Sequence, residues 1–315
     1  MAEEKTYLFG PVPSRRLGLS LGVDIVPLKT CTLDCIYCQL AETTEKTVRR
    51  KEYVPVEPVL NQLKERLANG LQADFITFSG SGEPTLNSSL GEFIERIKEI
   101  TDIPVAILTN GTLLYIPDVR ADCAKADVVL PSLDAADEQT FHKINRPHTD
   151  ISFNNLVSGL CAFRNEFAGR IWLEVFLVEG INTGPEQIEK IADVIKKICP
   201  DRIQLNTAVR PTADPTVKKV ETEKLKEIAK LLGTDCEVVA DFSPLCHQKN
   251  LQTKAEYVLS ILKRRPCSLE DICAGLGIQP TEASKYINLF QHQGIIVSEQ
   301  KNGRLFFSAR SQPGS

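Results

Sequence analysis

Short apolar runs alternate along the chain with segments in which apolar residues recur every three or four positions. Runs of the first kind predict buried strands, and segments of the second kind predict helices that pack through one face. The predicted strands cover residues 19–26, 73–79, 104–109, 126–132, 170–178 and 202–206. Repeated strand–helix units predict a parallel sheet with helical crossovers, either an open doubly wound sheet or a barrel that is complete or incomplete.

The intervening segments carry recognisable helix starts. Pro58 lies near the start of a helix in EPVLNQLKERL, and Asn87 is expected to be the N-cap of the next helix. Pro185 opens a helix with an isoleucine on every turn of one face. Further helices are expected near 117–125, through 137–167 and at 222–232.

The pattern divides the chain into a domain of residues 1–250 and a smaller domain of residues 251–315. In the smaller domain, TKAEYVLSILKR predicts a first helix, and Ser268 with Asp271 predicts a capping box at the start of a second. A third helix begins at Pro280, and a hairpin turning at Asn302-Gly303 follows. Helix, helix–turn–helix and hairpin in this order are typical of a winged-helix domain, which often binds nucleic acid through its third helix.

Charge weakens the nucleic-acid interpretation. The whole chain has a net charge of −4, and residues 251–315 hold eight Lys and Arg against five Asp and Glu. The expected third helix has only Lys285 as a cation, against Glu282, so it is a poor electrostatic match for phosphates. The hairpin, with Lys301, Arg304 and Arg310, is the better candidate surface. We expect substrate or partner docking rather than direct nucleic-acid binding.

The chain has no apolar run approaching the ~20 residues that span a bilayer, and its start lacks an apolar signal-peptide core. We therefore expect a cytoplasmic protein with reduced cysteines. Of its ten cysteines, seven are scattered along the chain, and most of these are expected to be small buried hydrophobic residues.

Polar loops follow each predicted strand. They are the cysteine loop KTCTLDCIYCQL, SGSGEP (79–84), TNG (109–111), SLD (132–134), EGIN (179–182) and NTAVRP (206–211). Because ligands bind where the carboxyl ends of parallel strands converge, these loops predict one shared site.

The cysteine loop places Cys31, Cys35 and Cys38 in a C-x3-C-x2-C pattern. Three thiolates can hold three irons of a cubane iron–sulfur cluster and leave the fourth iron open for a substrate or cofactor. A zinc site would need a fourth ligand from elsewhere in the chain. A structural role for all three cysteines fits poorly with the polar residues between them.

The motif CTLDCIYC resembles that of the radical S-adenosylmethionine superfamily, with an aromatic residue one position before the last cysteine. The resemblance extends over about residues 9–210 and includes SGSGEP, TNG and SLD. It implies an α/β fold, a partial (β/α)6 barrel of parallel strands followed here by the small winged-helix domain. The N-terminal segment FGPVPSRRLGLSLGVDIVPLKTC is also similar to a subgroup related to the tRNA wyosine-base synthases.

The resemblance implies a 4Fe–4S cluster, bound by the three cysteines, and S-adenosylmethionine as cofactors. Wyosine-type enzymes carry extra cysteines before the main motif, and none precedes Cys31 here, so we expect one cluster. It places Tyr37 near the adenine and the SGSGEP loop at the methionine ammonium. Thr109 and Asn110 would contact the nucleoside, and Ser132 the ribose. The residues of the SGSGEP loop implied in binding are Gly80, Ser81, Gly82 and Glu83, and Ser81 stands where the family usually has glycine.

Other polar residues are weaker candidates. Glu174 shares a strand face with Trp172 and Phe176, so it points into the barrel as a cofactor-site residue or a partnered structural carboxylate. Asn182 is a candidate of the same kind. Candidates for an anionic substrate are Arg15, Arg16 and Arg210, and FHKINRPH (141–148) adds His142, Arg146 and His148, for which we expect no acid–base role.

The expected activity is radical chemistry on an unidentified substrate, RNA or peptide, with a reductant such as flavodoxin or ferredoxin as a partner. The pattern does not assign catalytic residues. The alternatives are a peptide-modifying radical enzyme and a non-catalytic metal-binding regulator.

Overall fold

The larger domain is built on an open, eight-stranded sheet in the order β1-β2-β5-β6-β7-β8-β9-β10. The computed structural model describes residues 6–14, 16–239, 254–276, 278, 280–301 and 303–310. From β2 to β10 every pair of neighbouring strands is parallel, whereas β1 is antiparallel to β2. The strands are β1 (Leu8–Ser14), β2 (Gly18–Val23), β5 (Phe75–Phe78), β6 (Val105–Thr109), β7 (Val128–Pro131), β8 (Arg170–Leu177), β9 (Arg202–Thr207) and β10 (Cys236–Val238).

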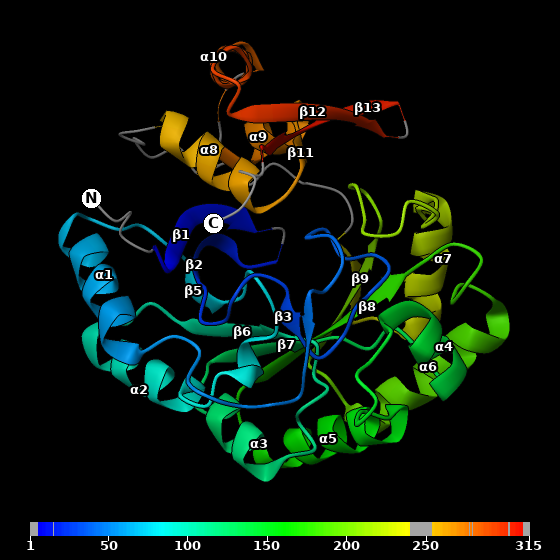
Figure 1. The fold of residues 1–315 in the computed structure, drawn as a ribbon. Coiled ribbons are helices and arrows are strands. Elements are labelled where there is room, and N and C mark those ends of the chain that lie inside the picture. The colour runs from blue at the N-terminus through cyan, green and yellow to red at the C-terminus, as the bar shows by residue number, and fades with distance from the viewer. Residues whose placement is uncertain are drawn as a thin grey trace.

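Helices cover the outer face of this curved sheet, so the partial barrel expected from the sequence is confirmed (Figure 1). They are α1 (Val56–Ala68), α2 (Leu90–Ile100), α3 (Pro117–Cys123), α4 (Glu138–Asn145), α5 (Phe153–Glu166), α6 (Pro185–Ile198) and α7 (Thr222–Leu232). Their apolar stripes form the main core with the outward side chains of the strands. Leu63 of α1 and Phe93 of α2, for example, are fully buried.

Two strands and one helix cap differ from expectation. The edge strand β1 was not predicted because LFGPVPS contains two prolines, which an edge strand tolerates and an interior strand does not. β10 was not predicted either, because its three residues are too few to show a period. The N-cap of α2 is Ser89 rather than Asn87. The Asn87 amide instead donates to the Ile25 carbonyl at 2.8 Å, after the short 3₁₀ helix η1 (Pro84–Leu86).

The C-terminal domain follows the predicted order of elements and has its own core. It contains α8 (Lys254–Arg264), β11 (Cys267–Ser268), α9 (Leu269–Leu276), α10 (Pro280–His292), β12 (Ile296–Lys301) and β13 (Arg304–Ala309). The predicted capping box is present: Asp271 N–H donates to Ser268 Oγ and Ser268 N–H to Asp271 Oδ2, each at 3.1 Å. The predicted boundary at residue 250 and Asn302 lie outside the described residues.

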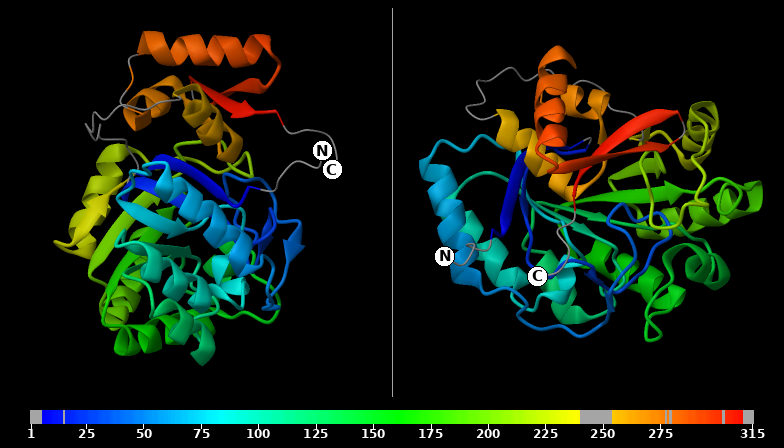
Figure 2. Two further views of the ribbon diagram at one scale, coloured as in Figure 1. Left: turned by 90° about the vertical axis from the view of Figure 1, so that its left-hand side faces the viewer. Right: turned by 45° about the horizontal axis from the view of Figure 1, so that its top comes forward.

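The C-terminal domain sits on the N-terminal hairpin of the sheet, as all views show (Figures 1 and 2). α8 packs along β1, and Val12 of β1 contacts the core of the C-terminal domain. None of the described helices is long and apolar enough to cross a membrane.

Candidate active site

The loop with the three cysteines follows β2 and lies across the carboxyl ends of the other parallel strands. Two short strands, β3 (Thr30–Cys31) and β4 (Glu45–Lys46), brace it. Backbone hydrogen bonds join it to the loop after β5, because Lys29 N–H donates to the Ser81 carbonyl at 2.7 Å and Glu83 N–H to the Thr30 carbonyl at 3.1 Å. The cysteine loop and the SGSGEP loop are therefore held as one unit.

The same loop is also bound from the other side of the barrel. The Asn145 carbonyl at the end of α4 accepts a hydrogen bond from Asp34 N–H at 2.9 Å. After β9, Ala213 N–H donates to the Cys38 carbonyl at 2.8 Å and Asp214 N–H to the Ile36 carbonyl at 2.9 Å. The convergence of strand-end loops that the sequence predicts is thus present.

Each of the three thiols has its own nitrogen donor. Lys29 Nζ lies 3.2 Å from Cys38 Sγ. Asn110 Nδ2 lies 3.5 Å from Cys31 Sγ. Asn145 Nδ2 lies 3.4 Å from Cys35 Sγ. Donors at ligand sulfurs stabilise the thiolate form and tune a bound metal.

Burial opposes ionisation of two of these thiols, those of Cys31 and Cys35, when nothing is bound. It raises the pKa of Cys31 to about 12, with a further contribution from Glu83. It also raises the pKa of Cys35 well above its usual range, with help from Asp134. The thiolates therefore need a positively charged partner, and metal binding would release their protons.

The donor set fits a cluster better than a single ion. Among the residues that the structure describes, no three His, Cys, Asp or Glu side chains are gathered closely enough to hold one metal ion. A zinc ion needs all its ligands within about 2.3 Å of one point. A cubane cluster takes one thiolate per iron, so its three ligands can be spread over a loop.

Glu83 links the SGSGEP loop to the TNG loop. Its Oε1 accepts hydrogen bonds from the Thr109 hydroxyl (2.6 Å) and from Thr85 (2.7 Å to the hydroxyl), and its Oε2 accepts one from Asn110 N–H (2.7 Å). Burial raises its pKa, and these hydrogen bonds act in the opposite direction. Both oxygens of the Glu83 carboxylate therefore have partners within the protein. The family resemblance instead assigns this carboxylate to the ammonium group of the methionine moiety.

Two glycines of the SGSGEP loop are required by close approach and backbone conformation. A Cβ on Gly82 would lie 1.9 Å from the Thr30 carbonyl oxygen, so only glycine lets this loop pack on the cysteine loop. Gly80 has a φ of 126°, which favours glycine.

A second cluster of polar residues surrounds the hydroxyl group of Tyr37. The tyrosine ring stacks on Phe176 at 3.9 Å, and its hydroxyl donates to Asp134 Oδ2 at 2.5 Å. Asp134 also accepts hydrogen bonds from Asn145 Nδ2 (2.8 Å) and Phe176 N–H (2.9 Å). Burial raises the pKa of Asp134 to about 6, although these hydrogen bonds favour the charged form.

Glu174 lies inside the barrel with polar partners. Its carboxylate is 2.8 Å from Arg16 Nη1 and accepts a hydrogen bond from Asn206 Nδ2 at 2.9 Å. On the same strand, Trp172 belongs with Leu130 to a small apolar cluster that is separate from the main core. Glu174 points into the barrel, as expected. Its two partners correspond to the alternative of a partnered structural carboxylate.

The remaining candidates have varied surroundings. Asn182 is fully buried, and its amide nitrogen donates at 2.8 Å to the carbonyls of both Asp134 and Phe176. Ser132 is half-buried and forms an isolated bridge with Glu174. His142 pairs with Glu138 on the exposed face of α4. Other placements are Arg146 paired with Asp214, His148 N–H bonded to the Thr32 carbonyl, and Arg15 outside the described residues.

Sequence reasoning missed Lys29, Asp134 and Asn145 as functional candidates. Lys29 directly precedes the cysteine pattern and Asp134 ends the SLD loop, so position along the chain could have suggested both. Asn145 lies at the end of a helix, 110 positions from the cysteine it contacts. Nothing local marks it.

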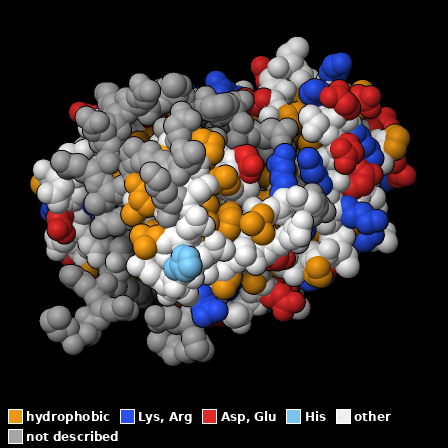
Figure 3. All heavy atoms as spheres, turned by 90° about the horizontal axis from the view of Figure 1, so that it is seen from above, with side chains coloured by type: hydrophobic (Ala, Val, Ile, Leu, Met, Phe, Trp, Pro, Cys, Tyr) orange, Lys and Arg blue, Asp and Glu red, His pale blue; other side chains and the backbone are white. Residues whose placement is uncertain are grey.

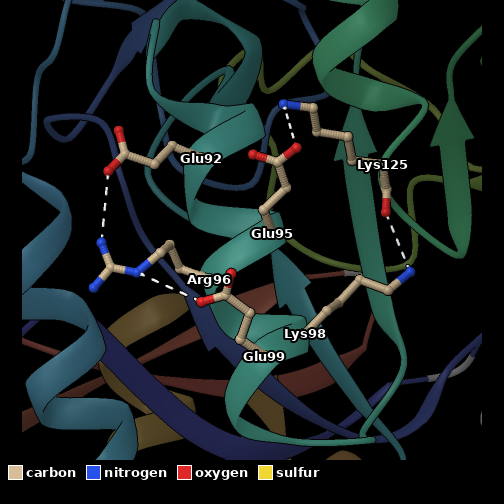
Figure 4. A pocket seen from close by; sticks show the side chains of 6 residues that line it. All are labelled: Glu92, Glu95, Arg96, Lys98, Glu99 and Lys125. Atoms are coloured by element: carbon tan, nitrogen blue, oxygen red, sulfur yellow. Dashed lines mark hydrogen bonds and ion pairs between the residues drawn. The ribbon is translucent and has the colours of Figure 1, made fainter.

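A groove on the outer surface, beside α2, is lined by charged side chains (Figure 4). Arg96 pairs with Glu92 and Glu99, and Lys125 with Glu95. Lys98, which also lines the groove, pairs with Asp127 beside it, so each charged side chain of the groove has an ion-pair partner. The groove lies against a helix on the outer face of the sheet and not at the strand-end loops. The strand-end loops remain the candidate site.

Comparisons with known proteins agree with this location. The model of the radical SAM superfamily matches residues 25–195, which include the three cysteines and the polar loops up to EGIN. A UPF0026 protein of Methanocaldococcus jannaschii is 32% identical over 314 residues, with 96% of this chain and 95% of that protein covered.

Two further similarities cover less. A protein of Brachyspira hyodysenteriae described as GTPase Obg is 39% identical over 304 residues, which are 96% of this chain but only 45% of that protein. The chain therefore spans less than half the length of that relative. The structure of a radical SAM methyltransferase from Sphaerobacter thermophilus has a TM-score of 0.52 at 16% identity, covering 70% of this chain and 65% of that one, and shows the shared fold.

Proposed function

The chain belongs to the radical SAM superfamily and to the UPF0026 family, and we propose that it generates a substrate radical at the cysteine loop. As a member of this superfamily it is an enzyme that uses a 4Fe–4S cluster and S-adenosylmethionine. The expected cofactors are thus confirmed. The observation that supports the location is the set of three thiols, each with its own nitrogen donor, on a loop bonded to the ends of several strands.

In this proposal Cys31, Cys35 and Cys38 hold the cluster. A cluster held by these cysteines would supply the electron for reductive cleavage of S-adenosylmethionine, and this cleavage would provide the radical chemistry used on the substrate. The electron comes from an external reductant such as flavodoxin or ferredoxin. Because thiols must be reduced to bind iron, we place the protein in the cytoplasm.

The chain's own residues position these groups. The SGSGEP loop is packed against the cysteine loop, so Gly80, Ser81 and Gly82 can present backbone atoms beside the cluster. Glu83 fixes that loop to Thr109 and Asn110, through bonds inside the protein. Polar groups proposed to contact the nucleoside from the remaining strand ends are Tyr37, Thr109, Asn110, Ser132 and Glu174. Fully buried Asn182 is proposed to support them through its hydrogen bonds to the carbonyls of Asp134 and Phe176.

The substrate is proposed to dock on the C-terminal domain, which stands beside the site. Lys301, in the β12–β13 hairpin, donates from its Nζ to Thr212 Oγ1 at 3.0 Å. Thr212 lies in the loop after β9 that also binds the cysteine loop. A macromolecule held by this domain would reach the barrel mouth, the end of the barrel where the strand-end loops converge. RNA and peptide are the two substrate classes to compare.

The test is release of 5′-deoxyadenosine and methionine by anaerobically reconstituted, reduced protein given S-adenosylmethionine. No release would contradict the proposal. Metal binding without affinity for S-adenosylmethionine would favour a non-catalytic regulator. Incubation with deuterated tRNA or peptide pools, followed by measurement of deuterium in 5′-deoxyadenosine, would identify the substrate class.

A further inference from the structure

The C-terminal domain contacts the SGSGEP loop through Arg264, the last residue of α8. Its Nη1 lies 2.6 Å from Asp24 Oδ2 and 3.4 Å from Ser81 Oγ. Its guanidinium also lies over the Phe9 ring, 3.6 Å from the centroid. The side chains of Arg264 and Asp24 are 25% and 11% exposed, so this ion pair is shielded from water and stronger than a surface pair.

Asp24 contacts both Arg264 and the SGSGEP loop. It follows β2 directly, and its Oδ1 accepts a hydrogen bond from Ser81 N–H at 3.2 Å, while its Oδ2 is bonded to the Ser81 hydroxyl. A Cβ on Gly80 would lie 3.0 Å from Arg264 Nη1 and 3.1 Å from the Asp24 carboxyl. The arginine and the carboxylate therefore pack directly on the backbone of the loop.

Ser81 connects this contact to the cysteines. Its carbonyl accepts the 2.7 Å hydrogen bond from Lys29 N–H. Lys29 has a φ of 61°, a left-handed conformation that is unfavourable for a residue with a side chain. The hydrogen bond helps to hold it, and Lys29 Nζ reaches Cys38 Sγ. A continuous series of contacts thus runs from α8 to the third cysteine.

A second contact anchors the domain on the opposite side of the barrel mouth. Asp271 of α9 lies 3.3 Å from Nη2 of Arg210, which is 1% exposed and belongs to the loop after β9. The C-terminal domain therefore contacts both Asp24, directly after β2, and the loop after β9, and these two segments lie toward opposite edges of the sheet. With two such contacts, the domain is less free to move relative to the loop that Arg264 contacts.

We propose that Arg264 is a positioning residue for the cofactor loop: through Asp24 and Ser81, the C-terminal domain holds the SGSGEP loop in the conformation that binds S-adenosylmethionine. The inference rests on the proposed function, because it takes SGSGEP as part of the cofactor site. It also explains why serine stands at position 81, where the family usually has glycine. The serine hydroxyl takes part in the contact between the domains.

The first measurement needs no cofactor. In the full-length, metal-free protein, Arg264→Gln should speed hydrogen–deuterium exchange in a peptide covering residues 79–84, since that loop loses its restraint. Lys263→Gln is the matched control, because Lys263 is the exposed neighbour on the same helix. It should leave the exchange unchanged.

The second measurement is the dissociation constant for S-adenosylmethionine, on anaerobically reconstituted protein without reductant. Arg264→Gln should weaken binding about tenfold, the order expected for one charge-assisted hydrogen bond. Arg264→Lys, which keeps the charge, should recover part of the affinity. Since Arg264→Gln could disturb packing on Phe9, Asp24→Asn provides an independent variant in the barrel that should loosen the same loop.

The two hypotheses fail differently. If the wild-type protein with its cluster does not bind S-adenosylmethionine, the proposed function is wrong. If the wild-type protein binds it, and both Arg264→Gln and Asp24→Asn keep wild-type affinity and exchange, the positioning role is overturned. Additive effects of Arg264→Gln and Asp24→Asn would also contradict it, because two members of one path should be non-additive.

Discussion

The barrel mouth and the outer surface of the C-terminal domain are built in opposite ways. At the mouth, the carboxylates Glu83 and Asp134 are buried and accept several hydrogen bonds from neighbouring loops. On the C-terminal domain, Leu289 of α10, Val297 of β12 and Leu305 of β13 are 47%, 39% and 49% exposed. Figure 3 looks onto this end of the molecule and shows hydrophobic side chains reaching its surface.

This difference in burial suits the two regions to different roles, cofactor positioning and substrate docking. A buried polar network costs stability unless every member is bonded, so each side chain at the mouth fixes its neighbours. Exposed apolar side chains contribute little to the fold and remain available to a partner. We infer that cofactor positioning depends on the mouth and substrate docking on the exterior of the C-terminal domain.

Cys35→Ala should abolish cofactor chemistry, because two thiolates cannot replace three as cluster ligands. Reconstituted wild-type protein should contain about four irons per chain. The variant should contain almost no iron and release no 5′-deoxyadenosine. Cys199→Ala, at an exposed cysteine, is the matched control and should behave as wild type. Normal turnover by Cys35→Ala would refute the site, and about eight irons in the wild type would indicate a second cluster.

Asp134→Asn should change how stability depends on pH. Folding raises the pKa of Asp134 from 3.8 to about 6, so its contribution to stability is present below the lower value and lost as pH rises through the upper one. At 1.36 kcal/mol per pKa unit, the difference in unfolding free energy between wild type and variant should change by about 3 kcal/mol between pH 3 and 7.

The measurement is urea denaturation of metal-free protein across that pH range. Asp137→Asn is the control, because the Thr140 N–H lowers the pKa of Asp137 and the pH trend should have the opposite sign. A pH-independent difference for Asp134→Asn would show that this carboxyl does not titrate as the structure implies.

Glu174→Gln should destabilise the barrel by about 2 kcal/mol, since it removes the charge that balances Arg16 inside the sheet. Chemical denaturation at pH 7 measures the change. Glu179→Gln removes a more exposed partner of Lys224 and should cost less than about 1 kcal/mol. If Glu174→Gln is no more destabilising than Glu179→Gln, the interior pair is not structural.

Leu305→Ser should have the smallest effect on the fold, less than about 0.5 kcal/mol, because the side chain is half exposed. Uncoupled cleavage of S-adenosylmethionine should be unchanged, whereas turnover of the true substrate should fall. Buried Phe307 on the same strand provides the contrast, since Phe307→Ser should unfold the C-terminal domain. A loss of uncoupled cleavage in Leu305→Ser would break the separation between the two regions.

Local patterns were sufficient for most elements of the fold. Six of the seven parallel strands of the large sheet, the order of elements in the C-terminal domain and the Ser268–Asp271 capping box follow from periodicity and cap residues within a few positions. The seventh, β10, has three residues and is too short to show a period. The edge strand β1 was an exception, because its prolines argue against a strand unless its place at the sheet edge is known.

The sequence by itself determined the three cysteines, the polar strand ends and hence the place and kind of chemistry, because ligand identity and spacing are local properties. Only the tertiary structure decided the partners of these residues. Asn145 meets Cys35 across 110 positions, and Arg264 meets Asp24 across 240. Such pairs depend on how the sheet curves and where the second domain packs, and contacts across this distance leave no period or cap in the sequence.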